Sequence, residues 1–316
     1  MPRILSIWAS PSRPSAGWRR LRPTRPKRFA GTRSCSRPHI MSRRARSPMQ
    51  LHERLKNQAY WDEVFGEGNV PKKEIKPGSR YVTLPGWHPT TKSVRGVVRT
   101  REPLMADAMI HVDTNPFNMA VAEFPVSVGY RASSGKWREH VPDLAIRRRD
   151  GSVVVIDVMG FYVQRHLGWP ARRTQAMREI FTVLGAHYRL LDERTLHMRP
   201  LIDNLRTMWR HKRIAAQQPW IDEVAAEVLM LPLPTRIGTI MRSITRNTLI
   251  GRWADEDEWR VVGEVNPAFT AIMQLAMAGR IAVDLRVPFS QFTHVTPTPP
   301  ALAASPTTEL RFERAA

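Results

Sequence analysis

The spacing of apolar and polar residues predicts an α/β region in the first two thirds of the chain. A helical spacing begins near residue 50, and a second one covers residues 101–111. Residues 71–89, between these helices, are punctuated by Pro and Gly and predict a loop. Residues 119–130 predict a strand that Pro125 interrupts.

The strongest local pattern is a pair of β-rich runs on either side of Asp150-Gly151, which predicts a hairpin. A helix is expected at residues 171–184, where Gly185 ends it, and residues 187–191 predict one more strand. The resulting order of helix, three strands, helix and strand is typical of an α/β fold with a mixed sheet.

The pattern becomes helical beyond Pro200. Four helices are predicted, which begin near residues 201, 221, 237 and 267. Thr235 is a candidate N-cap of the third helix and Asn266 of the fourth, which Gly279 ends. A strand at residues 281–285 follows, and this order of helices, Gly and strand resembles a winged helix.

Length and composition narrow the possible classes of protein. The chain has 316 residues, which suggests about two domains, and 42% of them are hydrophobic, which is enough for a buried core. The single cysteine, Cys35, excludes a disulfide scaffold and a Cys-based zinc cluster. The sequence has no uninterrupted apolar run of about 18 residues and therefore predicts no membrane span.

The charge of the chain favours a polyanionic partner. The formal net charge is +21, which points most directly to nucleic acid. Twelve Arg and Lys27 in the first 52 residues supply +13 of this charge, so the remainder of the chain carries +8.

Residues 1–50 form a basic leader rich in Arg, Pro and Ser, and we expect it to be disordered because it has little apolar surface to bury. Three interpretations stay open: a nucleic-acid-binding arm, a transit peptide, or translation from a start codon upstream of Met41 and Met49. We favour the third. The leader has no apolar stretch of secretory length, so export is not expected.

Asp143 and Asp157 lie on the two arms of the predicted hairpin, and the loop decides whether they meet. A two-residue loop pairs Asp143 with Val158, whereas a three-residue loop with Gly151 in the left-handed position pairs Asp143 with Asp157. The sequence permits both. Paired carboxylates repel unless a cation lies between them, and Mg²⁺ prefers such oxygen ligands. The alternative is a surface hairpin with solvated acids, although Asp157 follows an apolar run typical of a buried strand.

The motifs around these acids resemble a known family. Pro142-Asp143 and Asp157-Val158-Met159 resemble the PD-(D/E)xK nuclease motif, and their context resembles the TnsA-like endonuclease subunits of heteromeric transposases. The other motifs that carry the resemblance are Arg101-Glu102 at a helix start, Phe124-Pro125 before a strand, the segment from Gly185 to Glu193, Pro200-Leu201 with Asn204-Leu205, and Gly279-Arg280-Ile281.

The resemblance implies a restriction-endonuclease-like α/β core with a mixed sheet, followed by a helical, winged-helix-like C-terminal domain. The expected divisions are a leader at 1–50, an N-terminal helix and loop at 51–98, the nuclease-like domain at 99–197, the winged-helix-like domain at 198–295 and a disordered tail at 296–316.

The resemblance also implies that Glu102, Asp143 and Asp157 are catalytic and ligate Mg²⁺ or Mn²⁺. Water would then hydrolyse a phosphodiester at the transposon end. Met159 departs from the family, which has Lys at this position to polarise the water and stabilise phosphate charge. Either another side chain replaces this Lys, or the chain is a catalytically impaired DNA-binding and assembly subunit. The candidate substitutes are Lys136, Gln164, Arg165, Arg172 and Arg173, of which Arg172 and Arg173 are favoured on geometry.

The implied partners are double-stranded DNA, a DDE transposase that cuts the other strand, and an ATPase regulator of transposition, with no membrane. The expected location is the bacterial cytoplasm, in association with the nucleoid. Basic residues beside Trp209 are candidates for DNA contact, or else they form a solvated face with Trp209 in the core. They are Arg206, Arg210, Lys212 and Arg213. A third hypothesis is a stand-alone regulator that acts through the winged helix.

Overall fold

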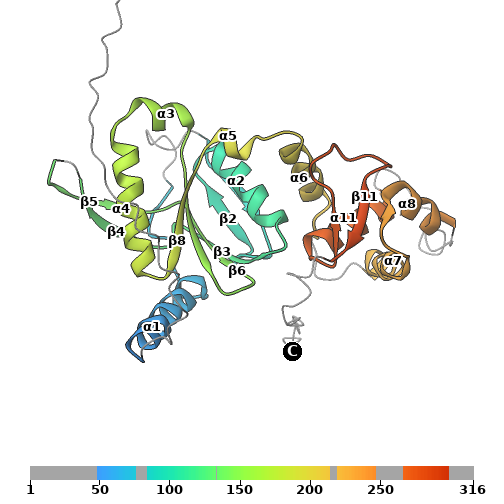
Figure 1. Ribbon diagram of the computed structural model, residues 1–316, viewed down its shortest axis with the longest axis horizontal. Coiled ribbons are helices and arrows are strands. Elements are labelled where there is room, and N and C mark those ends of the chain that lie inside the picture. The colour runs from blue at the N-terminus through green and yellow to red at the C-terminus, as the bar shows by residue number, and fades with distance from the viewer. Residues whose placement is uncertain (1–47, 76–83, 133, 214–218, 247–265, 299–316) are drawn as a thin grey trace, which may run out of the picture. The chain divides into compact units, whose positions relative to one another are not determined.

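The computed structural model of the chain describes residues 48–75, 84–132, 134–213, 219–246 and 266–298 (Figure 1). All of them belong to one compact unit, Ser47–Ala316. Most of the predicted leader lies outside the described residues, but helix α1 (Pro48–Phe65) already begins inside the range expected to be disordered.

A four-stranded mixed sheet is the centre of the α/β region, as predicted. Its strands are β3 (Asn118–Glu123), β6 (Leu144–Arg148), β7 (Val153–Val158) and β8 (Ala186–Leu191), in the order β3-β6-β7-β8 (Figure 1). β6 is antiparallel to β3 and to β7, whereas β7 and β8 are parallel. All six residues of β7 are buried, as expected for a strand covered on both faces.

Helices cover both faces of this sheet. Helix α2 (Pro103–Thr114) packs Met105 and Met109 against the apolar residues of β6 and β7 that alternate on one face. Helix α4 (Trp169–Val183) and the end of α1 cover the other face through a second buried cluster. α4 ends before Gly185, whose positive φ of 71° is accessible to Gly without strain.

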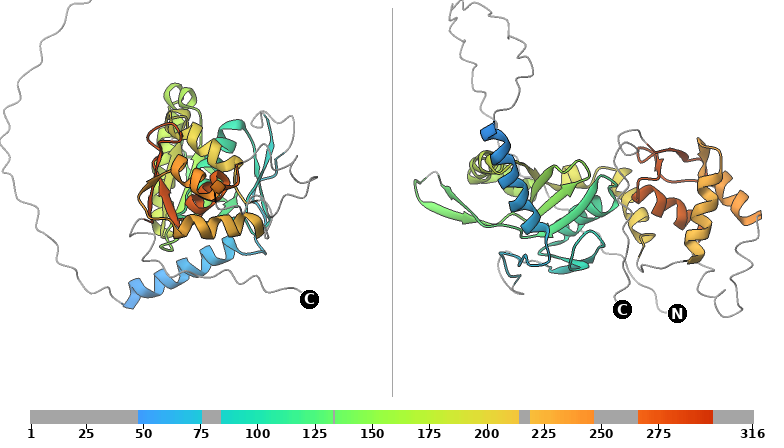
Figure 2. Two further views of the ribbon diagram at one scale, coloured as in Figure 1. Left: turned by 90° about the vertical axis from the view of Figure 1, so that its right-hand side faces the viewer. Right: turned by 90° about the horizontal axis from the view of Figure 1, so that it is seen from below.

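Two strand pairs lie outside the sheet. β1 (Gly86–Pro89) pairs with β2 (Val97–Thr100), so the loop predicted for residues 71–89 is wrong at its end. The pattern misses β1 because a four-residue strand that begins with Gly and ends with Pro gives no alternation signal. β4 (Val128–Arg131) pairs with β5 (Trp137–His140), and this ribbon extends away from the sheet (Figure 2).

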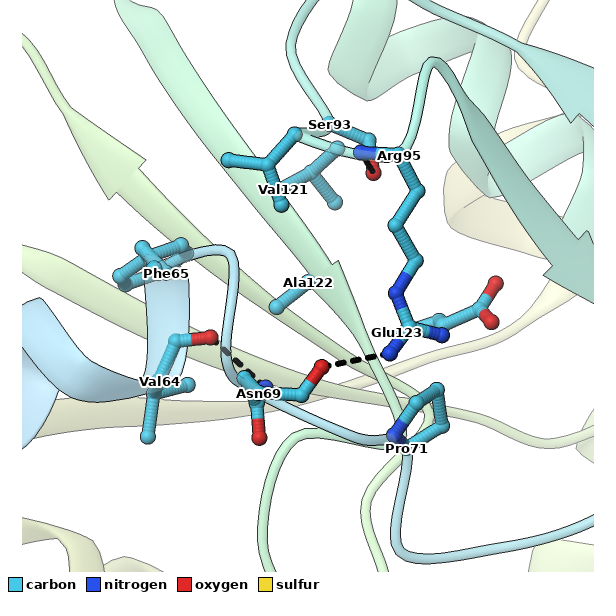
Figure 3. A pocket seen from close by; sticks show the side chains of 11 residues that line it. Val64, Phe65, Asn69, Pro71, Ser93, Arg95, Val121, Ala122 and Glu123 are labelled. Atoms are coloured by element: carbon cyan, nitrogen blue, oxygen red, sulfur yellow. Dashed lines mark hydrogen bonds between the residues drawn. The ribbon is translucent and has the colours of Figure 1, made fainter.

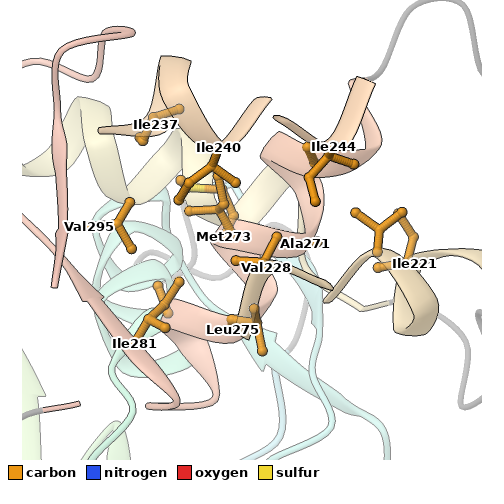
Figure 4. Packing of buried hydrophobic residues seen from close by; sticks show 14 of the residues in the cluster. Ile221, Val228, Ile237, Ile240, Ile244, Ala271, Met273, Leu275, Ile281 and Val295 are labelled. Carbon is orange, nitrogen blue, oxygen red and sulfur yellow. The ribbon is translucent and has the colours of Figure 1, made fainter. Parts of the chain in front are cut away.

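The C-terminal half contains the predicted helices. They are α6 (Leu201–Arg210), α7 (Pro219–Met230), α8 (Ile237–Arg246) and α11 (Pro267–Met277), preceded by the short helices α3 (Phe161–His166) and α5 (Glu193–Leu196). α7, α8 and α11 bury one apolar cluster, in which Val228, Ile240 and Met273 lie together (Figure 4). The Asn266 side chain accepts a hydrogen bond from the Phe269 N–H, which confirms the predicted N-cap.

A small antiparallel sheet accompanies these helices. Its strands are β9 (Thr235–Arg236), β10 (Ile281–Val283) and β11 (His294–Pro297), in the order β10-β11-β9. Thr235 therefore belongs to a strand rather than acting as a helix cap, and the tail predicted to be disordered from residue 296 begins inside β11. Residues 299–316 lie outside the described residues. Among the described helices, none is both long and apolar enough to cross a membrane.

Candidate functional site

The hairpin has the register of the three-residue loop. β6 and β7 pair Leu144 with Ile156, and Gly151 in the loop has a φ of 79°. The regular pairing of β6 with β7 ends at Leu144 and Ile156. The Asp143 N–H donates to Ile156 O at 3.1 Å, so Asp143 does not form the next regular pair. Asp143 therefore turns out of the strand just where the two acids were predicted to meet.

Asp143 is held by a bidentate ion pair. Its side chain is almost fully buried, and its Oδ1 and Oδ2 accept from Nε and Nη2 of Arg101 at 2.7 and 3.0 Å. Oδ2 also accepts from the Val158 N–H at 2.8 Å. Paired hydrogen bonds between charged groups fix the carboxylate in one orientation.

The Arg101 guanidinium contacts further oxygen atoms. Its Nη1 lies 2.7 Å from Oε1 of Glu102, and Nη2 donates to Val158 O at 2.6 Å. Glu102 Oε1 is buried without a hydrogen bond of good geometry. Burial and the charge of Asp143 raise the pKa of Glu102 although Arg101 opposes this. Burial alone would lower the pKa of Arg101, but the hydrogen bonds and charge of Asp143 raise it, so the guanidinium stays charged.

Asp157 has a different set of partners from Asp143. Its buried Oδ2 accepts from the Tyr188 hydroxyl at 2.5 Å and lies 2.6 Å from Nε2 of His140 and 3.4 Å from Nη2 of Arg173. Burial opposes the charged form, but the hydrogen bond and charge of His140 prevail and lower the pKa of Asp157. Burial and the charge of Asp157 raise the pKa of Tyr188, which remains a hydrogen-bond donor.

The three predicted metal ligands, Glu102, Asp143 and Asp157, thus fall into two groups. Among the described residues, no three His, Cys, Asp or Glu side chains converge as a metal-binding group. Glu102 and Asp143 converge through Arg101, and the third oxygen source is the backbone carbonyl of Val158 rather than the side chain of Asp157. We call these atoms the oxygen cluster: Glu102 Oε1, both Asp143 carboxylate oxygens and Val158 O.

Lys73 is a site residue that the sequence did not reveal. Burial lowers the pKa of its ammonium, the charge of Asp143 opposes this shift, and the charge of Arg101 adds to it. Phe124 links the segment of Lys73 to Asp143. Its N–H donates to Asp143 O at 2.9 Å, and its carbonyl accepts from the Lys72 N–H at 2.8 Å. Phe124 has a φ of 44°, a strained value for a bulky residue, and the Lys73 ammonium lies 5.6 Å from its ring.

The segment that carries Lys73 is also anchored at its start. Asn69 Nδ2 donates to Val64 O at 2.7 Å, and Arg95 Nη2 donates to Asn69 O at 2.5 Å, beside the small hollow next to Glu123 (Figure 3). A predicted loop gives no indication of such contacts, because they join residues far apart in the sequence. A Lys followed by an apolar anchor is too common to serve as a signal.

The side chains proposed to replace the missing Lys differ in what they contact. Gln164 Nε2 donates to Met159 O at 2.7 Å, so it lies at the motif position but is bonded to the backbone. Arg173 reaches Asp157 and stacks 5.0 Å from the Trp169 ring, and its buried Nε has no hydrogen-bond partner in the described part of the chain. The remaining candidates, Lys136, Arg165 and Arg172, are exposed.

The row of basic residues predicted to contact DNA is largely occupied by intramolecular contacts. Arg206 pairs with Asp107 at 2.8 Å, Lys212 lies 3.4 Å from Asp113, and Arg213 pairs with Asp222; only Arg210 of the four is exposed. Trp209 is half-buried, and its Nε1 donates to His88 Nε2 at 3.0 Å.

The site therefore consists of an oxygen cluster around one guanidinium, a neighbouring ammonium, and a second buried aspartate with its own donors. No protein-family model matches the chain, and no curated protein matches it either.

Proposed function

We propose that this chain is a metal-dependent DNA endonuclease subunit of a transposition machine. The observation that carries the proposal is the oxygen cluster, in which Glu102, Asp143 and the Val158 carbonyl surround a single positive charge. Two carboxylates and a carbonyl are the ligands that Mg²⁺ and Mn²⁺ prefer, and the Arg101 guanidinium occupies the place that such a cation would take. The donor set thus fits a hard divalent ion.

Further features support the proposed architecture. A mixed sheet whose hairpin carries both acids, with helices on each face, supports a restriction-endonuclease-like core. The small sheet β10-β11-β9 beside α8 and α11 supports a winged-helix-like C-terminal domain. We extend the proposal to double-stranded DNA as substrate and to a DDE transposase and an ATPase regulator as partners.

The chain's own residues would share the chemistry. Glu102, Asp143 and the Val158 carbonyl would hold the ion, which supplies Lewis-acid stabilisation of the phosphate charge when bound. Lys73 would take over the role that Met159 cannot fill, because Phe124 joins its segment to Asp143 and an ammonium there can stabilise a phosphate oxygen that gains charge. Asp157 orders the second layer of the site through His140 and Tyr188.

The test is calorimetric binding of Mg²⁺ and Mn²⁺ to the full chain, with Asp143→Ala as the comparison. We expect binding by the parent protein that Asp143→Ala abolishes, and strand cleavage in the complex with the transposase that requires the same residue. Asn57→Ala, which removes a polar side chain of α1 remote from the cluster, is the control. Metal binding that survives Asp143→Ala would refute the assignment of the site.

A second candidate function is a DNA-binding and assembly subunit without nuclease activity. Met159 and the bidentate Arg101–Asp143 ion pair favour it, because a guanidinium neutralises the carboxylate without any metal. In that case neither metal ion binds, even with DNA present, while the chain still associates with DNA and the transposase. If Asp157→Ala and Asp143→Ala both leave strand cleavage unchanged, the second candidate replaces the first.

A further inference from the structure

The ribbon formed by β4 and β5 has one fully exposed face. Pairing of Arg131 with Trp137 and of Gly129 with Glu139 places these four residues on that face, and all four are exposed. The other face carries Val128, which packs into the core cluster under α4. The ribbon is therefore anchored on one side and presents the other side to solvent (Figure 2).

The exposed part of the ribbon carries unbalanced positive charge. Arg131, Lys136 and Arg138 are exposed, and within the described residues none of the three forms an ion pair. The single acid of the ribbon, Glu139, accepts a hydrogen bond from the Ser127 hydroxyl at the ribbon's base. Three cations against this one acid leave the ribbon with a net positive charge, which is complementary to a polyanion.

An aromatic side chain shares the exposed face with one of these cations, Arg131, whereas Arg138 pairs with Tyr130 on the opposite face. Trp137 is 71% exposed, and its ring lies across from Gly129, beside a shallow hollow lined by Ser127 and Glu139. An exposed indole is costly on a surface without a partner, and it provides a flat apolar face for contact with a groove.

We propose that the β4–β5 ribbon is a DNA-binding arm that enters a groove of the duplex. A two-stranded ribbon has the width that the major groove admits. Arg131, Lys136 and Arg138 contact the phosphates on either side, and Trp137 contacts the groove. This inference rests on the proposed function, because it names the element that holds the DNA which the site would cut.

The ribbon is connected to the acid site at its base. His140 is the last residue of β5, and its Nε2 lies 2.6 Å from Oδ2 of Asp157 in β7. Because the contact is part of the sheet core, a duplex held by the ribbon lies at a fixed distance from the hairpin that carries both aspartates. The arm therefore positions the substrate as well as adding affinity.

The test is equilibrium binding of the full chain to a fluorescein-labelled duplex of mixed sequence, measured by anisotropy over a series of salt concentrations. The combined variant Arg131→Ala/Lys136→Ala/Arg138→Ala should weaken binding about tenfold or more and reduce the slope of log Kd against log salt by about 3. The control variant Lys56→Ala/Arg178→Ala/Arg286→Ala removes the same charge from exposed positions elsewhere and should change binding about twofold at most.

A pair of tryptophan variants tests the groove contact. Trp137→Ala should weaken duplex binding about fivefold or more, whereas Trp87→Ala, which removes a side chain of equal exposure (72%) from β1, should not. All substituted side chains are exposed, and circular dichroism melting checks that the variants remain folded. Because Trp137→Ala changes no charge, it tests the arm even if the triple variant unfolds.

The outcomes separate the two proposals. If the parent chain binds the duplex and the ribbon variants bind as tightly as their controls, the arm is wrong and the proposed function stands. If the parent chain binds no duplex, both fail. If Trp137→Ala instead abolishes a dimer seen by sedimentation and leaves duplex binding unchanged, the ribbon is a protein interface and the inference is overturned.

Discussion

Asp143 and Asp157 begin and end the same hairpin and are equally buried, yet their carboxylates are stabilised in different ways. Asp143 lies among other oxygen atoms, and one cation, Arg101, compensates all of them. Asp157 lies among donors, Tyr188 and His140, with Arg173 slightly farther away. The Arg101 guanidinium thus serves several oxygen atoms at once, whereas three side chains meet at a single oxygen of Asp157. Under the proposed function, Asp143 is therefore the residue expected to bind the metal, and Asp157 the residue expected to support the site.

The largest expected effect comes from removal of Arg101, the cation that the proposed metal ion would replace. Arg101→Ala leaves Asp143 buried without its ion pair and should lower the free energy of unfolding by about 3–5 kcal/mol in metal-free buffer. Mg²⁺ should restore part of this loss, because an ion then compensates the same oxygen atoms. Urea unfolding with and without Mg²⁺ measures both quantities.

Arg99→Ala is the matched control for this experiment. Arg99 Nε pairs with the buried Glu123 at 2.7 Å, so its removal also leaves a carboxylate unpaired, but outside the oxygen cluster. Arg99→Ala should be destabilising and insensitive to Mg²⁺. Equal insensitivity of Arg101→Ala would mean that Asp143 does not exchange its guanidinium for a metal.

An intermediate effect is expected from Lys73. Lys73→Met removes the ammonium beside Asp143 while keeping an apolar stem against Phe124, and should reduce strand cleavage about 100-fold with little change in unfolding free energy. Single-turnover cleavage in the assembled complex measures the change. Lys72→Met, at the exposed neighbouring position, should cleave like the parent, and the same loss in both variants would remove Lys73 from the site.

The smallest effect is expected at Asp157. Asp157→Asn keeps the shape of the side chain but loses the charge that His140 and Arg173 compensate, and should cost about 1–3 kcal/mol near neutral pH. Because folding lowers the pKa of Asp157, its stabilising contribution is present above about pH 4 and is lost as the pH falls through the lowered value. The difference in unfolding free energy between parent and variant should therefore shrink in acid, and a constant difference would show that the charge of Asp157 is not what stabilises the fold.

Local signals in the sequence predicted most helices and strands, but they missed contacts between residues that are far apart in the sequence. Gly151 permits the left-handed loop, Asn266 caps α11, and the β6 and β7 runs form the buried hairpin, because each depends on neighbours a few residues away. Thr235 failed as a cap because β11 pairs with it, a partner far along the chain.

The candidate site shows the same division. Asp143 and Asp157 became candidates because they lie on the arms of a predicted hairpin, whereas Glu102 became a candidate only through the resemblance to the nuclease family. It left the loop register open, and it gave no sign that Arg101, 42 residues from Asp143, would occupy the space between the carboxylates. Lys73 and Tyr188 were missed for the same reason.

The sequence by itself determined the α/β order, the hairpin and the helical C-terminal half, because these follow from local propensity and periodicity. The tertiary structure alone decided which charges meet. It turned Asp143 toward Arg101 and Val158, left Asp157 with Tyr188 and His140, and placed Lys73 over the ring of Phe124. Burial forces every carboxylate to find a partner, and which partner is within reach depends on how distant segments pack.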